Sequence, residues 1–157
     1  MQTVTIEMWI DASPERCFDA ARDLDLHVLS MQHTGERAVA GKTTGLIGLH
    51  EEVTWRGRHF GVTSVTQHFT SRITAFDRPR HFRDEMQRGA FRSFVHDHFF
   101  AAENGGTKMT DVLVFSAPVG VLGLLAEKLV LKRYMERLLT NRAKVIRAAV
   151  GKTGVSS

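Results

Sequence analysis

The sequence predicts an α+β fold in which a curved antiparallel sheet of about seven strands wraps around one long C-terminal helix, with two short helices after the first strand. Three observations predict this class. Residues 3–10 alternate between apolar and polar side chains, residues 35–115 are almost entirely β-strand in pattern, and the residues after Pro118 repeat with helical spacing. The chain has 157 residues, enough to bury one core. We therefore expect a single domain over residues 1–151 and a flexible tail over residues 152–157.

The N-terminal segment predicts one strand followed by two helices. Apolar side chains fall on alternate positions of residues 3–10, which read TVTIEMWI, as in a strand with one buried face. Ser13 is a favourable helix N-cap, and Pro14 sits at the first helical position, where its missing N–H costs nothing. A second short helix is expected from about Leu24 to Met31.

The central segment predicts an antiparallel meander. Two strands are expected to meet near RGRH, with Gly57 in the turn, and residues 77–80, DRPR, form another turn. The strand that contains FVHDHFF, residues 94–100, ends at Asn104-Gly105, a dipeptide that favours tight hairpins. The segment TKMTDVLVFS returns from that hairpin.

The C-terminal segment predicts one helix of about 30 residues, which would be about 45 Å long. Its apolar stripe comprises Leu122, Leu125, Leu129, Met135, Leu138, Ile146 and Ala149, and Gly151 is a plausible C-cap. A curved sheet alone would leave its inner face in water, so the helix is expected to lie across that face. If Leu129 is buried in the stripe, its replacement by alanine should cost about 2–5 kcal/mol.

Polar side chains share the apolar faces of several predicted strands. His96 and His98 lie in phase with two phenylalanines of residues 94–100, and counting back from the predicted turn places His98 opposite Asp111. Two other strands carry Glu51 and Asp84 in their apolar phases, and a short loop would bring Asp84 near His96. An uncompensated buried charge costs several kcal/mol, so these five groups must pair or line a wet pocket.

Three interpretations of this polar cluster remain open. It is a network that only fixes the sheet, the polar end of an apolar ligand pocket, or a catalytic site. In the catalytic interpretation His96 or His98 acts as general acid or base, oriented by Asp111 or Asp84. Asp111 is expected to favour the imidazolium form of His98. His-x-His with carboxylates can also ligate zinc, but this spacing is common, and no metal site is predicted.

Composition and motifs argue against several other functions. The net charge of +4 is spread among acids without a polybasic run, so nucleic-acid binding is not expected. The one cysteine, Cys17, cannot form an intramolecular disulfide. No apolar run approaches the roughly 20 residues of a membrane span, and the N-terminus lacks a secretion-signal pattern, so a cytoplasmic protein is expected. No cofactor is predicted, because the sequence has no phosphate loop, dinucleotide fingerprint or nucleophile elbow.

The order of elements resembles the helix-grip fold of the START-like superfamily, also called SRPBCC. The resemblance is carried by VTWRGRHFG, SRITAFDRPRHFRDEMQRGAFRSFVHDHFF, GGTKMTD and APVGVLGLLAEKLVLKRYMERLL. Within the superfamily the chain is similar to the bacterial polyketide cyclase/dehydrase-like branch. The resemblance implies a space between sheet and helix, but one scaffold hosts carriers, sensors and enzymes, so it leaves the activity open.

We therefore expect the protein to bind a small hydrophobic or aromatic molecule between the sheet and residues 118–140. The expected wall consists of Val53, Trp55, Phe82, Met86, Phe94, Phe100, Leu113, Phe115, Leu122, Leu125, Leu129 and Met135. One alternative is a cyclase/dehydrase-like acid–base enzyme for a polyketide-like substrate. Another is a regulatory or chaperone-like binding module, in which Arg78, Arg80 and Arg83 contact an acidic partner.

Overall fold

The computed structural model describes residues 1–58, 66–117 and 125–151, without the side chains of residues 125–128. The elements, in chain order, are β1 (Gln2–Ile10), α1 (Pro14–Ala21), α2 (Leu24–Ser30), the 3-10 helix η1 (Gln32–Thr34), β2 (Arg37–Gly41), β3 (Glu52–Gly57), β4 (Gln67–Asp77), β5 (His81–Arg88), β6 (Ser93–Glu103), β7 (Gly106–Ser116) and α3 (Leu125–Val150). The predicted tail, residues 152–157, lies outside the described residues.

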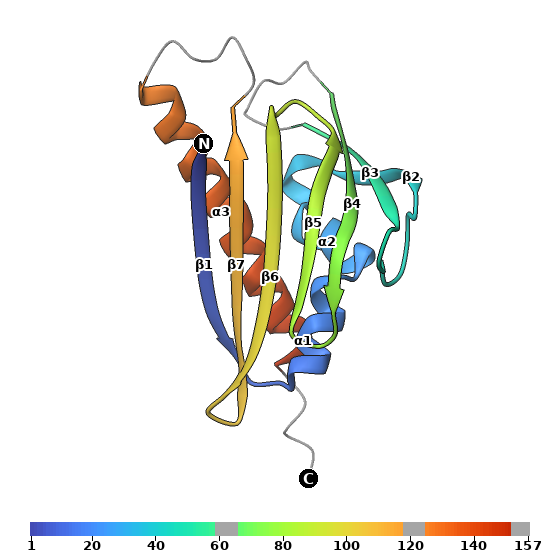
Figure 1. The fold of residues 1–157 in the computed structure, drawn as a ribbon, viewed down its shortest axis with the longest axis vertical. Coiled ribbons are helices and arrows are strands. Elements are labelled where there is room, and N and C mark those ends of the chain that lie inside the picture. Colours follow the sequence, from blue (N-terminus) through green and yellow to red (C-terminus); the bar gives the residue numbers. More distant parts are fainter. Residues whose placement is uncertain (59–65, 118–124, 152–157) are drawn as a thin grey trace.

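The seven strands form one antiparallel sheet in the order β1-β7-β6-β5-β4-β3-β2. The helices gather on one face of this sheet, and α3 crosses it diagonally (Figure 1). This arrangement confirms the predicted fold class, including the two short helices after the first strand. Of the described helices, none combines the length and apolarity needed to cross a bilayer.

The two short helices begin where their capping residues predict. The Ser13 side chain accepts a hydrogen bond from the backbone N–H of Arg16, and Pro14 opens α1. The Asp23 carboxylate accepts from the backbone N–H groups of Asp25 and Leu26 at the start of α2. Each cap satisfies backbone donors that the helix itself leaves unpaired.

The β6–β7 hairpin turns at Asn104 and Gly105, whose φ angles are 50° and 76°. Positive φ at both central residues is what a two-residue hairpin turn of this hand requires. Glu103 therefore pairs with Gly106, as predicted. Gly57 does not form a turn: it is the last residue of β3 and pairs with Gln67.

Two apolar clusters join the helices to the sheet. In the first, Phe18 of α1 meets the rings of Phe82 and Phe100 edge-on, at centroid distances of 5.3 and 5.4 Å. The second packs α3 against β1 and β7, and its buried members include Val4, Leu113, Phe115, Met135, Leu138 and Leu139. Burial of these side chains anchors α3 across the sheet.

The buried face of α3 differs from the predicted stripe. Its buried residues are Met135, Leu138, Leu139, Arg142, Ala143, Ile146 and Val150. Leu129 is 50% exposed, since six residues at about 100° each place it about 120° around the helix from Met135. Ala149 is also exposed. The prediction that Leu129 is buried was therefore wrong, and the side chains of Leu122 and Leu125 lie outside the described residues.

Candidate functional site

A cavity of about 130 Å³ lies between the inner face of the sheet and helices α2 and α3. Its apolar wall comprises Met31, Trp55, Phe69, Phe91, Phe94, Tyr134, Met135, Leu138 and Leu139. Its polar lining includes His27, Glu36, Asp84, His96, His98 and Arg142. An apolar cavity of about 150 Å³ can hold one benzene molecule, so this space is on the scale of a single ring.

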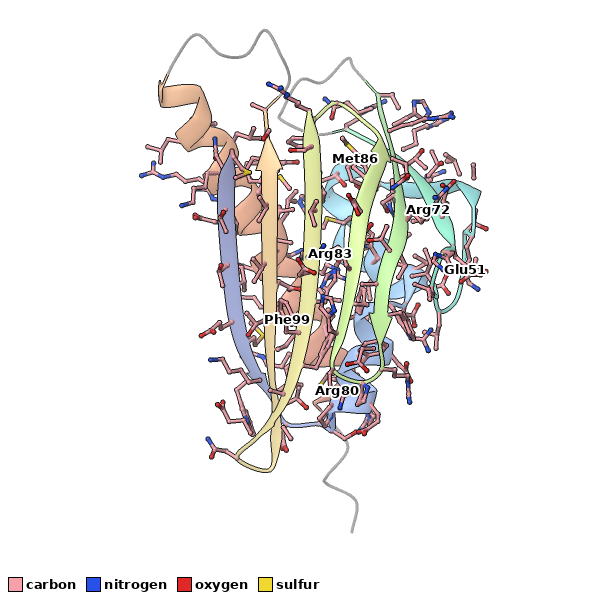
Figure 2. All side chains as sticks on the ribbon, viewed as in Figure 1. Glu51, Arg72, Arg80, Arg83, Met86 and Phe99 are labelled. Atoms are coloured by element: carbon pink, nitrogen blue, oxygen red, sulfur yellow. The ribbon has the colours of Figure 1, made fainter. Side chains whose placement is uncertain are left out.

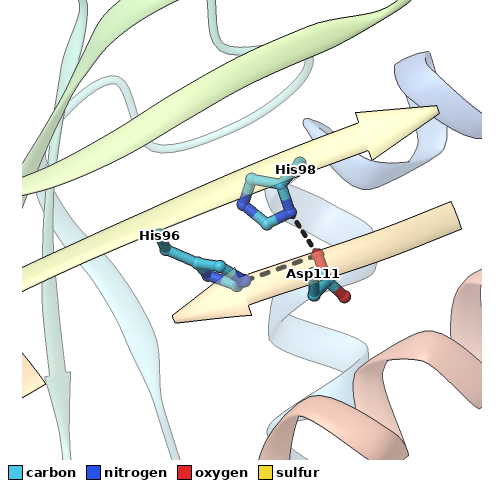
Figure 3. Close-up of side chains that lie close together, drawn as sticks. All are labelled: His96, His98 and Asp111. Carbon is cyan, nitrogen blue, oxygen red and sulfur yellow. Dashed lines mark hydrogen bonds and ion pairs between the residues drawn. The ribbon is translucent and has the colours of Figure 1, made fainter. Parts of the chain in front are cut away.

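The predicted strand register brings the polar side chains of the sheet together. His98 lies directly opposite Asp111, and Asp84 lies directly opposite His96. His98 Nδ1 is 2.5 Å from Asp111 Oδ1, and His96 Nε2 is 3.4 Å from the same oxygen (Figure 3). His98 and Asp111 are fully buried, while His96 and His98 both line the cavity.

Arg142, which was not among the predicted site residues, joins this cluster from α3. Its guanidinium lies 3.9 Å from Asp111 Oδ1 and 3.4 Å from His98 Nδ1, and it donates to the backbone carbonyl of Ala21. The side chain is only 8% exposed. Its spacing in the sequence could have indicated this burial, because residue 142 lies on the same helical face as Leu138 and Ile146.

Burial lowers the pKa of His98 to about 3, and the neighbouring His96 adds to this effect. Asp111 favours the imidazolium form through its charge and its hydrogen bond, as predicted, but this effect does not outweigh desolvation. Burial would raise the pKa of Asp111, yet charge interaction and hydrogen bonding with the two histidines hold that pKa well below its usual range. At neutral pH His98 is therefore neutral, with Nδ1–H donating to ionised Asp111.

This protonation pattern predicts a loss of stability in mild acid. The unfolded chain protonates His98 near pH 6.5, whereas the native state does not until about pH 3, so unfolding takes up a proton in between. Lowering the pH from about 7.5 to 5.0 should reduce the free energy of unfolding by about 2 kcal/mol through this residue. Urea titrations of the wild type and His98→Gln at both pH values test this. Equal pH dependence in the two proteins would contradict it.

His96, His98 and Asp111 offer three possible metal-ligand atoms within 4.8 Å of one another. The chemistry of their neighbours fits a proton network better than a metal centre. The Nδ1 proton of His98 already occupies the short contact with Asp111, and Arg142 already supplies positive charge beside that carboxylate. A divalent cation would have to displace this proton, and it would be repelled by the positive charge of the Arg142 guanidinium.

Two buried polar atoms of cavity-lining residues have hydrogen-bonding capacity to spare in the part of the chain that the structure describes. Asp84 Oδ1 has no partner there, and His96 Nε2 has only its 3.4 Å contact with Asp111 Oδ1. Burial raises the pKa of the Asp84 carboxyl, against the opposing effect of the Ser71 hydroxyl. Buried polar atoms that are poorly satisfied are uncommon, and here they lie beside a cavity, so a bound molecule can satisfy them.

A second histidine–carboxylate pair lies on another wall of the cavity. His27 Nε2 is 2.6 Å from Glu36 Oε1, and the His27 ring stacks on Trp55 with 4.2 Å between centroids. Both members line the cavity. This pair was missed, because the contact crosses from α2 to the start of β2, and no periodicity of the sequence relates the two positions.

Several predicted site residues lie elsewhere. Glu51 precedes β3, at the side of the sheet where β2 and β3 lie (Figure 2). It pairs with Lys42 at 3.1 Å and accepts a hydrogen bond from the backbone N–H of Gly48. Its backbone N–H closes a turn onto the carbonyl of Gly48, and its side chain is 42% exposed, so it belongs to a surface turn. Lys42 and the Gly48 amide lower the pKa of its carboxyl. Of the predicted wall, Trp55, Phe94 and Met135 line the cavity, whereas Val53, Phe82, Phe100, Leu113 and Phe115 fill the core and Met86 lies outside the lining.

The arginines proposed for an acidic partner are bound within the chain. Arg78 pairs with Asp19 at 2.7 Å, Arg80 with Asp77 at 2.9 Å, and Arg83 with Asp97 at 2.8 Å. Figure 2 places Arg80 at the turn between β4 and β5 and Arg83 on the sheet. An acidic partner would have to displace an existing carboxylate at each, so these residues do not form a free docking patch.

An antiparallel sheet that holds a C-terminal helix, with a cavity between them, defines a helix-grip protein. The family model described as polyketide cyclase / dehydrase and lipid transport matches residues 1–151, and the chain belongs to this family of the SRPBCC superfamily. No curated protein matches the sequence.

Solved structures share the fold at low sequence identity. Protein TTHA0849 of Thermus thermophilus is similar with a TM-score of 0.70 and 22% identity, covering 94% of this chain and 99% of that one. Ms6760 of Mycobacterium smegmatis gives 0.65 and 20%, covering 94% and 89%. Major latex-like protein 151 of Panax ginseng gives 0.61 and 12%, covering 95% and 97%. At these identities the similarities support the fold, and they do not assign a function to any residue of this chain.

Proposed function

We propose that the protein binds a small aromatic or hydrophobic molecule, of about one substituted ring, in the cavity between the sheet and α3. The observation that carries this proposal is an apolar, largely aromatic wall that ends in buried polar groups, of which Asp84 Oδ1 has no partner among the described residues. Ligand pockets commonly combine such a wall with a few polar groups that orient the ligand. The ring would lie against Phe94 and Tyr134, with its polar substituent toward Asp84 and His96.

A pair of probes of nearly equal shape tests this proposal. p-Cresol carries a hydroxyl where p-xylene carries a methyl, so the two differ mainly in hydrogen bonding. We expect both to bind in NMR titrations and p-cresol to bind about fivefold more tightly, since one net hydrogen bond contributes about 1 kcal/mol. Replacing His96 with leucine should remove most of that preference.

The control for this test is Leu129→Phe, on the exposed side of α3, which should change neither affinity. If neither probe gives saturable binding, the cavity does not accept a single ring. If both bind equally in the wild type, the polar end does not orient the ligand.

Acid–base catalysis is the second candidate, and a specific arrangement favours it. One cavity is lined by His98 with its Asp111 partner, by His27 with Glu36, and by Asp84 with a raised pKa. An imidazole that a carboxylate orients can take a proton from carbon and return a proton to oxygen, as enolisation, cyclisation and dehydration require. The family description makes a cyclase or dehydrase reaction the finer form of this candidate.

Exchange of the methyl hydrogens of acetophenone in D₂O tests the catalytic candidate, because exchange proceeds through the enol. The wild type should accelerate exchange, and His98→Gln should reduce the acceleration by about 100-fold. Binding of p-cresol to the variant shows whether the cavity is intact. If the wild type binds acetophenone but its methyl hydrogens exchange no faster than in buffer, the protein does not catalyse this reaction.

A further inference from the structure

A second hollow, of about 390 Å³, is lined by residues of β2 and β3 and of the segments beside them. Strand β2 is the edge strand on this side of the sheet, and β3 is its neighbour (Figure 1). Its described lining includes His33, Thr34, Gly35, Arg37, Arg56 and Arg58, and no acidic side chain is among the described lining residues. We call it the rim groove. Gly57 lines both the rim groove and the cavity, so the two spaces adjoin.

The arginines of the rim groove have no carboxylate partner among the described residues, unlike most other arginines of the sheet. Within the described residues, the side chains of Arg37, Arg56 and Arg58 have no hydrogen bond or ion pair. In contrast, Arg72 pairs with Glu52 at 2.5 Å, and Arg83 pairs with Asp97 at 2.8 Å. Residues 59–65, HFGVTSV, follow Arg58 in the sequence and contain no acid that could neutralise the groove.

The strand register makes this concentration of positive charge unfavourable for the empty protein. Arg37 lies directly opposite Arg56 in the β2–β3 ladder. Like charges directly opposite each other destabilise a sheet, because their side chains stand about 5 Å apart at the base. A bound anion would convert this repulsion into attraction.

We infer that the rim groove binds a phosphate group, through the guanidinium groups of Arg37, Arg56 and Arg58. Guanidinium groups bind phosphate oxygens through paired, charge-assisted hydrogen bonds. A phosphate monoester carries between about 1.5 and 2 negative charges at neutral pH, which matches several neighbouring cations better than one carboxylate does. The phosphate can belong to a soluble ester or to a lipid headgroup, and this inference does not depend on what occupies the cavity.

The test compares two double variants that lose the same charge. Arg37→Gln/Arg56→Gln removes two groove arginines, and Arg72→Gln/Arg80→Gln removes two arginines that are paired elsewhere. In NMR titrations with inorganic phosphate and glycerol 3-phosphate at constant ionic strength, the wild type should show saturable shifts at the amides of Gly35, Gly57 and Arg58. The groove variant should bind at least tenfold more weakly, and the paired-arginine variant should stay within twofold of wild type.

Vesicles distinguish the source of the phosphate. Sedimentation with phosphatidylcholine vesicles, with or without phosphatidic acid, should show binding only to the anionic vesicles if a lipid headgroup is the ligand, and the groove variant should lose it. Saturable binding of the soluble phosphates supports a soluble ester. Equal losses in the two double variants, or no binding in either assay, would overturn the inference.

Thermal denaturation without phosphate separates binding from folding. Because Arg37 and Arg56 repel each other, the groove variant should have a melting temperature equal to or higher than that of wild type. A lower melting temperature would mean that these arginines stabilise the native sheet, and the inference of an unneutralised anion site would then be wrong.

Discussion

Replacing Asp111 with asparagine should lower the free energy of unfolding by about 3–5 kcal/mol, because it leaves a buried cation without its counter-charge. Asp111 is completely buried, accepts a hydrogen bond from His98, and lies 3.9 Å from the guanidinium of Arg142. The asparagine keeps nearly the same volume, so the loss reports the charge and not a cavity. Urea denaturation at neutral pH measures it.

The matched control is Glu7→Gln, which breaks the ion pair of Glu7 with Lys108 on the neighbouring strands β1 and β7. That pair is solvent-exposed, so its loss should cost less than about 1 kcal/mol. Asp111→Asn combined with Arg142→Met should cost less than the sum of the single changes, because both charges leave together. A loss below about 1 kcal/mol in Asp111→Asn alone would show that Arg142 does not depend on this carboxylate.

Truncation of Ile146 to alanine should cost about 2–5 kcal/mol, because the side chain is 1% exposed and packs in the core beneath α3. Leu129→Ala should change stability by about 0.5 kcal/mol or less, since Leu129 lies on the exposed side of the same helix. Urea denaturation of both variants tests the orientation of α3. If Leu129→Ala were the more costly change, the helix would be rotated from the orientation described.

The strand pairing could be predicted because local chemistry determines it. The Asn104-Gly105 turn sets the β6–β7 register, and side chains alternate along each strand, so the contact of His98 with Asp111 follows by counting. The helix was harder to orient. A long amphipathic pattern allows more than one apolar stripe. The stripe that includes Leu129 was chosen, so the predicted buried face of the helix is rotated from the one observed.

The polar side of the site could not be predicted fully, because residue type alone does not reveal burial. Arg142 is a charged residue that the predicted apolar stripe leaves out, yet it lies in the buried row of α3, where Asp111 compensates its charge. Glu51 shared an alternating pattern with Val53 but precedes the strand, so the alternation does not apply to it. Such errors are expected wherever a charge is buried or a strand begins.

The measurement that tests the central claim most directly is the set of nuclear Overhauser effects between bound p-cresol and the protein. If a ring occupies the cavity, its protons should show effects to the rings of Phe94 and Tyr134 and to the methyl group of Met135, which line that space. Effects to Trp9 or Phe99, large side chains that are each 43% exposed, would instead place the ring on the surface and contradict the account.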